Sequence, residues 1–140
     1  MSLYNVFNIA GSSMSAQSVR LNTVASNLAN ADVVSSTAEG VYRSRQPVFS
    51  AVMDALHGTE QNQSSIPVRV AAIVEDKAAA RQEYQPDHPM ANAEGYIFKS
   101  NVNAIEEMTN MMAASRSYQN NVEVFNTSKQ LLLKTLSLGR

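Results

Sequence analysis

The chain is 140 residues long and 44% hydrophobic, enough for one folded domain with a modest core and too apolar for wholesale disorder. Its 11 basic and 12 acidic residues give a net charge of −1 without a basic cluster, which argues against nucleic-acid binding. It contains no cysteine, which excludes disulfides and thiol chemistry, and no apolar run approaches the roughly 18 residues of a membrane span.

The N-terminal part of the chain has the apolar spacing of a helix with one buried seam. Apolar residues recur every seven positions at Phe7, Met14, Leu21 and Leu28, with Leu3, Ala10, Val24 and Ala31 at the interleaved positions. Gln17 is the one polar residue in this series. The pattern predicts a long helix from Asn5 to Ala31, frayed or kinked near Gly11, whose seam packs against another helix.

This first helix carries almost no charge. Residues 1–34 contain only Arg20 and Asp32 as charged residues, whereas a surface helix usually has Lys and Glu on its solvent face. The positions outside the seam are mostly Ser, Asn, Thr and Ala, which can be packed without burying charge. A low-charge amphipathic helix with one exposed face remains possible, but we favour a helix that contacts protein on both faces.

The middle of the chain, residues 33–100, is rich in turn and strand signals. Residues 35–41 are typical of a turn-rich link, and residues 58–65 of a polar loop. Residues 42–53 alternate loosely and predict a strand interrupted by Pro47, and residues 68–74 predict a second strand. Beyond it the sequence predicts a continuation or bulge over 78–84, an extended proline-bounded passage over 85–89, and a short strand or turn over 95–98.

The C-terminal part repeats the helical spacing. Its apolar series is Ala104, Met111, Tyr118, Phe125 and Leu132, with Met108, Ser115, Val122 and Leu136 interleaved and Lys129 as the break. Asn101 or Asn103 is the expected N-cap, because acidic residues follow in the first turn. We therefore predict an α+β chain, mainly α, in which residues 1–32 and 101–140 pair as an antiparallel coiled coil and form one helical core. Residues 33–100 form a small β-rich outer lobe.

No residue pattern in the sequence predicts catalysis or a metal site. Asp54 and His57 could share a helix face, but no third ligand follows at a telling spacing. His88 lies in a turn, and the acidic pairs at 75–76 and 106–107 are adjacent in sequence, so their side chains point apart. The sequence therefore predicts no enzyme, no cofactor, no metal and no small-molecule substrate.

The methionines of the last helix leave two interpretations open. Three of the chain's seven methionines cluster there, at positions 108, 111 and 112. Adaptable core packing is the usual role of such a cluster. It could also form a contact face that adapts to several slightly different neighbours.

Three separated motifs, in order along the chain, resemble the family of bacterial flagellar basal-body rod and hook proteins. The first is the segment 25–32, Ala-Ser-Asn-Leu-Ala-Asn-Ala-Asp, preceded by Leu21-Asn22. The second is Tyr-Gln-Pro-Asp-His-Pro-Met-Ala at 84–91, followed by Gly-Tyr-Ile at 95–97 and Asn-Val-Asn at 101–103, which is similar to the proximal rod proteins of that family. The third is the C-terminal segment 111–140. The region 34–67 matches least.

The resemblance implies a structural axial subunit and no catalysis. In this family the terminal helices pack together and line a helical tube, and the middle lobe faces outward. The expected partners are copies of the chain, other rod subunits and the flagellar type III export apparatus. The expected location is the periplasmic rod of the basal body, which is consistent with the absence of a cleavable signal peptide from the sequence. The rod transmits torque and leaves a channel for exported subunits.

We expect the contacts between subunits at residues of both helices. The candidate interface residues are Phe7, Met14, Leu21, Val24, Asn27, Leu28, Asn30, Met108, Met111, Tyr118, Val122, Phe125, Leu132 and Leu136. A coiled-coil adaptor or chaperone of a type III export system is the alternative, since it shares the long helices. A small enzyme is a third reading, which the absence of catalytic signatures disfavours.

Overall fold

The computed structural model describes residues 3–52 and 66–139 of the chain. Within these ranges two long helices, α1 (Leu3–Ala29) and α2 (Ala104–Leu138), flank five strands in sequence. The strands are β1 (Val34–Ser35), β2 (Arg45–Ala51), β3 (Val68–Glu75), β4 (Arg81–Tyr84) and β5 (Tyr96–Lys99). The predicted α+β class with long terminal helices is confirmed.

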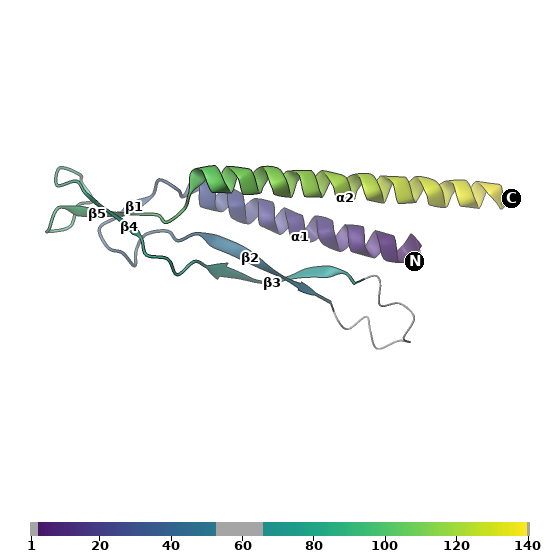
Figure 1. Cartoon of the computed structure of the whole chain (residues 1–140), viewed down its shortest axis with the longest axis horizontal. Helices are drawn as coiled ribbons and strands as arrows, with labels where there is room; N and C mark the ends of the chain where they lie inside the picture. Colours follow the sequence, from purple (N-terminus) through teal and green to yellow (C-terminus); the bar gives the residue numbers. More distant parts are fainter. Residues whose placement is uncertain (1–2, 53–65, 140) are drawn as a thin grey trace.

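The two helices lie side by side and run in opposite directions (Figure 1). Near the start of α1 the rings of Phe7 and Phe125 meet edge to face with centroids 4.9 Å apart. Further along, Arg20 donates a hydrogen bond of 3.3 Å to Asn110. With 35 residues against 27, α2 is about 12 Å longer at 1.5 Å per residue, and its C-terminal end extends past the start of α1 (Figure 1).

The buried stripe of α2 lies beside the predicted apolar series. Its buried residues are Glu107, Ala114 and Ser128, at intervals of seven and fourteen positions. On α1, Ala10, Ala16 and Val24 are the buried apolar residues. Ala10 and Val24 belong to the predicted apolar series, whereas Ala16 and the three buried residues of α2 lie outside it.

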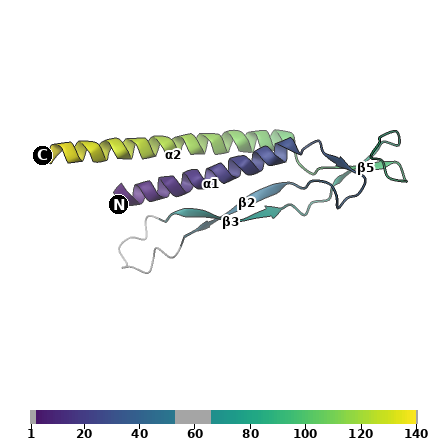
Figure 2. The same ribbon diagram turned by 180° about the vertical axis from the view of Figure 1, so that it is seen from behind.

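A twisted ribbon made of β2 and β3 lies along α1, on the side away from α2 (Figures 1 and 2). The strands are antiparallel, with an irregularity between Val48 and Phe49. Because α1 lies between α2 and this ribbon, it contacts protein on two sides, which fits its low charge. Both strands were predicted, although β2 is shorter than the segment 42–53.

Pro47 does not weaken this ribbon. The Asp76 N–H donates to the Ser44 carbonyl at 2.7 Å, so in an antiparallel ladder the alternate residues 45 and 47 direct their backbone groups away from β3. Pro47, which has no N–H, therefore occupies a position where no ladder bond is lost.

A second sheet, of order β1-β5-β4, lies at the end of the helix pair remote from the chain termini (Figure 1). Its central strand carries Ile97, which is almost fully buried. Lys99 pairs with Glu83 across the sheet, and this contact, with a hydrogen bond from Gln85, lowers the pKa of the Glu83 carboxyl. The segment 78–84 does not continue β3, because its residues Arg81–Tyr84 form β4 of this sheet. The strand β1 was not predicted, and it ends at the first residue of the predicted link 35–41.

The helix ends largely agree with the sequence. Asn103 is the N-cap of α2, because its side chain accepts a hydrogen bond of 3.2 Å from the Ile105 N–H. Asn101, the other candidate, instead binds the Ser44 N–H in the loop before β2. The helix α1 runs unbroken through Gly11. Neither described helix is both long and apolar enough to span a bilayer.

Candidate assembly interface

The side chain of Asn27 joins α1 to the first residues of the ribbon. It is 0% exposed, and it uses all of its hydrogen-bonding groups. Its amide nitrogen donates to the Arg45 carbonyl at 2.8 Å and to the Ser44 hydroxyl at 3.4 Å. Its oxygen accepts from the Arg45 N–H and from the Tyr42 hydroxyl, both at 2.9 Å. The amide therefore pairs with both backbone groups of Arg45, as a neighbouring strand would, and covers the edge of β2 at this point.

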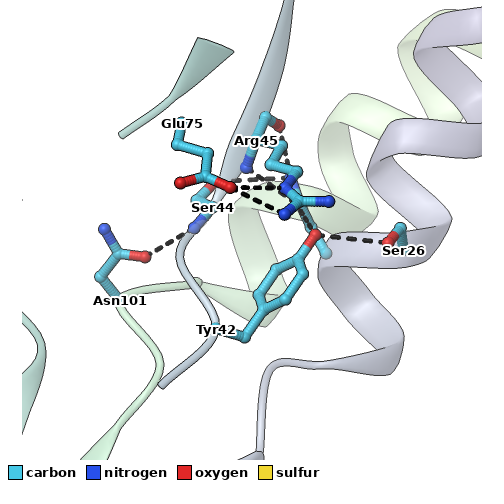
Figure 3. A network of polar contacts seen from close by, with 7 residues as sticks. Ser26, Tyr42, Ser44, Arg45, Glu75 and Asn101 are labelled. Carbon is cyan, nitrogen blue, oxygen red and sulfur yellow. Dashed lines mark hydrogen bonds and ion pairs between the residues drawn. The ribbon is translucent and has the colours of Figure 1, made fainter. Parts of the chain in front are cut away.

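Further polar contacts surround this joint (Figure 3). The Tyr42 hydroxyl also lies 3.3 Å from the Ser26 hydroxyl on α1. Asn101, just before α2, accepts the Ser44 N–H at 2.8 Å. Arg45 binds Glu75 on the neighbouring strand at 2.7 Å, and its guanidinium lies 5.5 Å from the centre of the Tyr42 ring. These contacts fix the segment just before the ribbon to α1 and to the segment just before α2.

Glu107 is the one buried acidic residue among the described parts of the chain. It is 5% exposed and lies in the first turn of α2 next to Asn27. Burial raises the pKa of its carboxyl, and the nearby charge of Glu106 raises it further. The nearby Asn27 side chain and the charge of Arg20 offset part of this effect. One oxygen, Oε2, has no hydrogen-bond partner among the described residues.

The candidate interface residues of α1 are mostly enclosed within the chain itself. Val24 and Asn27 are buried, and the rest are half-buried: Phe7, Met14, Leu21, Leu28 and Asn30. The structure brings Phe7 together with Phe125 of α2. Asn30 donates to the Ser26 carbonyl at 2.8 Å, at the end of its own helix.

The candidate residues of α2 divide into two groups. Met111, Val122 and Phe125 are half-buried, whereas Met108, Tyr118, Leu132 and Leu136 are exposed. Tyr118 and Leu132 are each 37% exposed, so both keep part of their surface open. Met112 is exposed as well as Met108, so core packing within the chain accounts only for Met111 among the three clustered methionines.

The heptad series missed several exposed apolar residues of α2. Ile105, Met112, Leu131, Leu133 and Leu138 are all exposed. The three leucines belong to the C-terminal part of α2, and the end of this helix extends past α1 (Figure 1). We call residues 131–138 the leucine overhang. Leu138 is 84% exposed. The run of three leucines at 131–133 was the available signal, because a helix with one seam does not place three consecutive residues in it.

The described residues do not form a metal site. No group of three His, Asp or Glu side chains there could hold a metal ion. The pair Asp54 and His57 lies outside the described residues. The ring nitrogen Nδ1 of His88 accepts the Met90 N–H at 3.1 Å within a turn, the local role expected for it.

Comparison with known proteins gives matches at both ends and over the full length. A family model described as flagella basal body rod protein matches residues 7–35, and one described as flagellar basal body rod FlgEFG protein C-terminal matches residues 93–138. The chain is 50% identical to the flagellar basal-body rod protein FlgC of Yersinia enterocolitica, over 100% of both chains. It is 49% identical to that of Salmonella typhimurium and 48% to that of Escherichia coli O157:H7, again over 100% of both chains.

Proposed function

The chain belongs to the flagellar basal-body rod protein family and is a structural subunit of that rod, and we propose that it builds the proximal part of the rod. In this proposal it helps to form a hollow shaft that transmits torque and lets exported subunits pass. It performs no catalysis and needs no cofactor. Its partners are copies of itself and other rod subunits.

The observation that carries this proposal is the leucine overhang. Five leucines of this segment are exposed: Leu131, Leu132, Leu133, Leu136 and Leu138. A protein that works alone rarely leaves a contiguous apolar surface of this kind at the end of a helix. In a tube the helices of neighbouring subunits cover it. Contacts of this kind are heterologous and repeat without closing, because a closed two-fold pair would stop growth.

The candidate interface residues divide naturally in this arrangement. Those that are exposed in the single chain, Met108, Tyr118, Leu132 and Leu136, contact neighbouring subunits directly. The half-buried ones, Phe7, Met14, Leu21, Leu28, Asn30, Met111, Val122 and Phe125, contribute their remaining open surface. Val24 and Asn27 act from within, by holding the surrounding elements in place.

The same arrangement assigns different roles to the ends and the middle of the chain. Residues 1–32 and 101–140 form the axial core, in which the helix pair is a coiled coil, and residues 33–100 form the outer lobe. The low charge of α1 supports an axial position, because few charges then have to be desolvated when subunits pack.

Export completes the proposal. The chain leaves the cell interior through the flagellar type III apparatus without a cleavable signal peptide, and it assembles in the periplasm.

The experiment that tests the function is electron microscopy of envelopes from a strain that lacks this gene. We expect inner-membrane rings without rods, in cells that do not swim. Complementation with the intact gene serves as the control and should restore both. Complete hook–basal bodies in the deletion strain would contradict the proposal and leave an export adaptor or chaperone as the better reading.

A further inference from the structure

A groove of about 370 Å³ opens where α1, α2 and β2 meet. Arg20 and Val24 of α1 contribute to it, and its other lining residues are Glu106, Glu107 and Asn110 of α2 and Arg45, Gln46, Pro47 and Phe49 of β2. Glu107 is 95% buried in this place, and its Oε2 atom has no hydrogen-bond partner in the described parts of the chain. The chain therefore leaves a buried carboxylate oxygen unsatisfied on a residue that lines an open groove.

The charges of the groove do not balance. Arg45 is already paired with Glu75 at 2.7 Å. Arg20, the other cation, donates to Asn110 at 3.3 Å and can offset only one of the two carboxylates Glu106 and Glu107. Neither of these carboxylates forms an ion pair within residues 3–52 and 66–139. One negative charge of the lining thus remains unmatched.

Such an arrangement is costly for a single chain. A buried carboxylate without a full set of partners is disfavoured by desolvation, and a neutral side chain of the same shape would relieve the cost. Residues that break a local rule in this way are expected at functional positions. A cationic group of another molecule would supply the missing partner.

We propose that this groove receives a lysine or arginine side chain from α2 of a second copy of the chain, which pairs with Glu107 and Glu106 in the assembled rod. Charge complementarity supports a second copy. The helix α2 carries Arg116, Lys129 and Lys134, which are exposed and have no ion-pair partner among the described residues. Pro47 and Phe49 provide an apolar wall for the aliphatic part of such a side chain.

The contact is heterologous, because the groove and the cations lie on different parts of the same chain, as an open helical assembly requires. The inference rests on the proposed function, since it needs neighbouring copies in a rod. If one side chain binds both Glu106 and Glu107, arginine would fit best, because its planar guanidinium group can bind two oxygens at once.

The first test is Glu107→Gln, with Glu123→Gln as the matched control, since Glu123 is an exposed residue of α2 outside the groove. We expect the purified Glu107→Gln protein to unfold at the same urea concentration as the wild type or a higher one. Cells that carry it should nevertheless lose rods and swimming, while cells with Glu123→Gln should keep both. Normal rods in the Glu107→Gln strain would overturn the inference. If the gene is required for rods at all, such a result leaves the proposed function intact.

The second test identifies the source of the cation. A photo-crosslinking residue is placed at Gln46, which lines the groove, in assembled basal bodies. We expect a cross-linked peptide from α2 of the same protein that contains Arg116, Lys129 or Lys134, and loss of rods when that residue is changed to Gln. A cross-link to another protein, or to a peptide without these residues, would overturn the assignment to a second copy.

Discussion

Replacing Asn27 with Ala should strongly destabilise the isolated subunit. The change removes four hydrogen bonds and leaves the N–H and C=O groups of Arg45 without partners in a part-buried place. Each buried backbone group left unsatisfied costs about 1–3 kcal/mol. The Tyr42 hydroxyl keeps Ser26 within 3.3 Å, so only the two groups of Arg45 are counted. We expect a loss of about 3 kcal/mol, taken within that range for two partly hydrated groups.

The assay is urea unfolding of the purified protein, followed by circular dichroism. With an m-value of about 1.5–2 kcal/mol per M, the midpoint should fall by about 1.5–2 M. Asn30→Ala is the matched control from the same motif, because within the described part of the chain the Asn30 side chain bonds only to the Ser26 carbonyl, and it is not fully buried. Its effect should stay below about 1 kcal/mol. Equal midpoints for the two variants, or a loss below about 1 kcal/mol for Asn27→Ala, would refute the idea that Asn27 replaces a strand partner.

Four further predictions follow from other contacts. Leu138→Lys changes the most exposed residue of the leucine overhang, so it should alter the free energy of unfolding by less than about 0.5 kcal/mol and still abolish swimming. Swimming cells would count against the overhang as an interface. A double-mutant cycle on Phe7 and Phe125, measured by urea unfolding, should give a coupling free energy of about 0.5–1.5 kcal/mol for their edge-to-face contact. If the effects of the two single substitutions simply add, the rings do not interact. Gly95→Ala should lower the free energy of unfolding by more than about 1 kcal/mol, because φ is +80° and a Cβ atom would lie 2.8 Å from the Tyr84 ring. The control Gly11→Ala, in open space on a helix, should stabilise the chain. Thermal unfolding of both proteins tests this prediction. Burial raises the pKa of Glu107 in the folded state above its ordinary value of 4.5, so stability should fall as the pH rises from that value through the folded one. Glu107→Gln should remove this part of the fall, and identical pH profiles for the two proteins would contradict it.

The apolar series of the two ends predicted the long helices well, because tertiary packing of an amphipathic face leaves a spacing that is visible in the sequence. It located the centre of the contact less well. Ala114 and Ser128 are small or polar, and Glu107 is charged, yet these three form the buried stripe of α2. Close packing of helices selects small size at such positions, and a pattern based on hydrophobicity does not register size.

The strands show a similar limit. The alternating residues of β2 and β3 were visible in the sequence, because the two faces of a strand alternate along the chain and have different surroundings, α1 and solvent. By contrast β1 has only the two residues Val34 and Ser35, too few for any periodicity, and its existence depends on pairing with Lys99 and Phe98 far along the chain. The separation of β4 from β3 is likewise a matter of partner choice, which local sequence does not encode.

The joint at Asn27 was recognised from the sequence only as part of a motif. Its role depends on the backbone of Arg45, and a backbone group has no signature in the side-chain sequence. The unsatisfied oxygen of Glu107 is also a property of three elements that meet in space. The sequence predicted only that Glu107 lies in the first turn of α2, where the helix dipole ordinarily explains an acidic residue.

The most direct test of the central claim is a cryo-electron microscopy map of the intact rod from the bacterium that carries this gene. We expect the two helices of this chain to lie at the wall of the channel, with the leucine overhang covered by helices of neighbouring subunits. A map in which this chain is absent from the rod, or in which Leu131 to Leu138 contact no other subunit, would contradict the claim that the chain is built into the shaft through its helices.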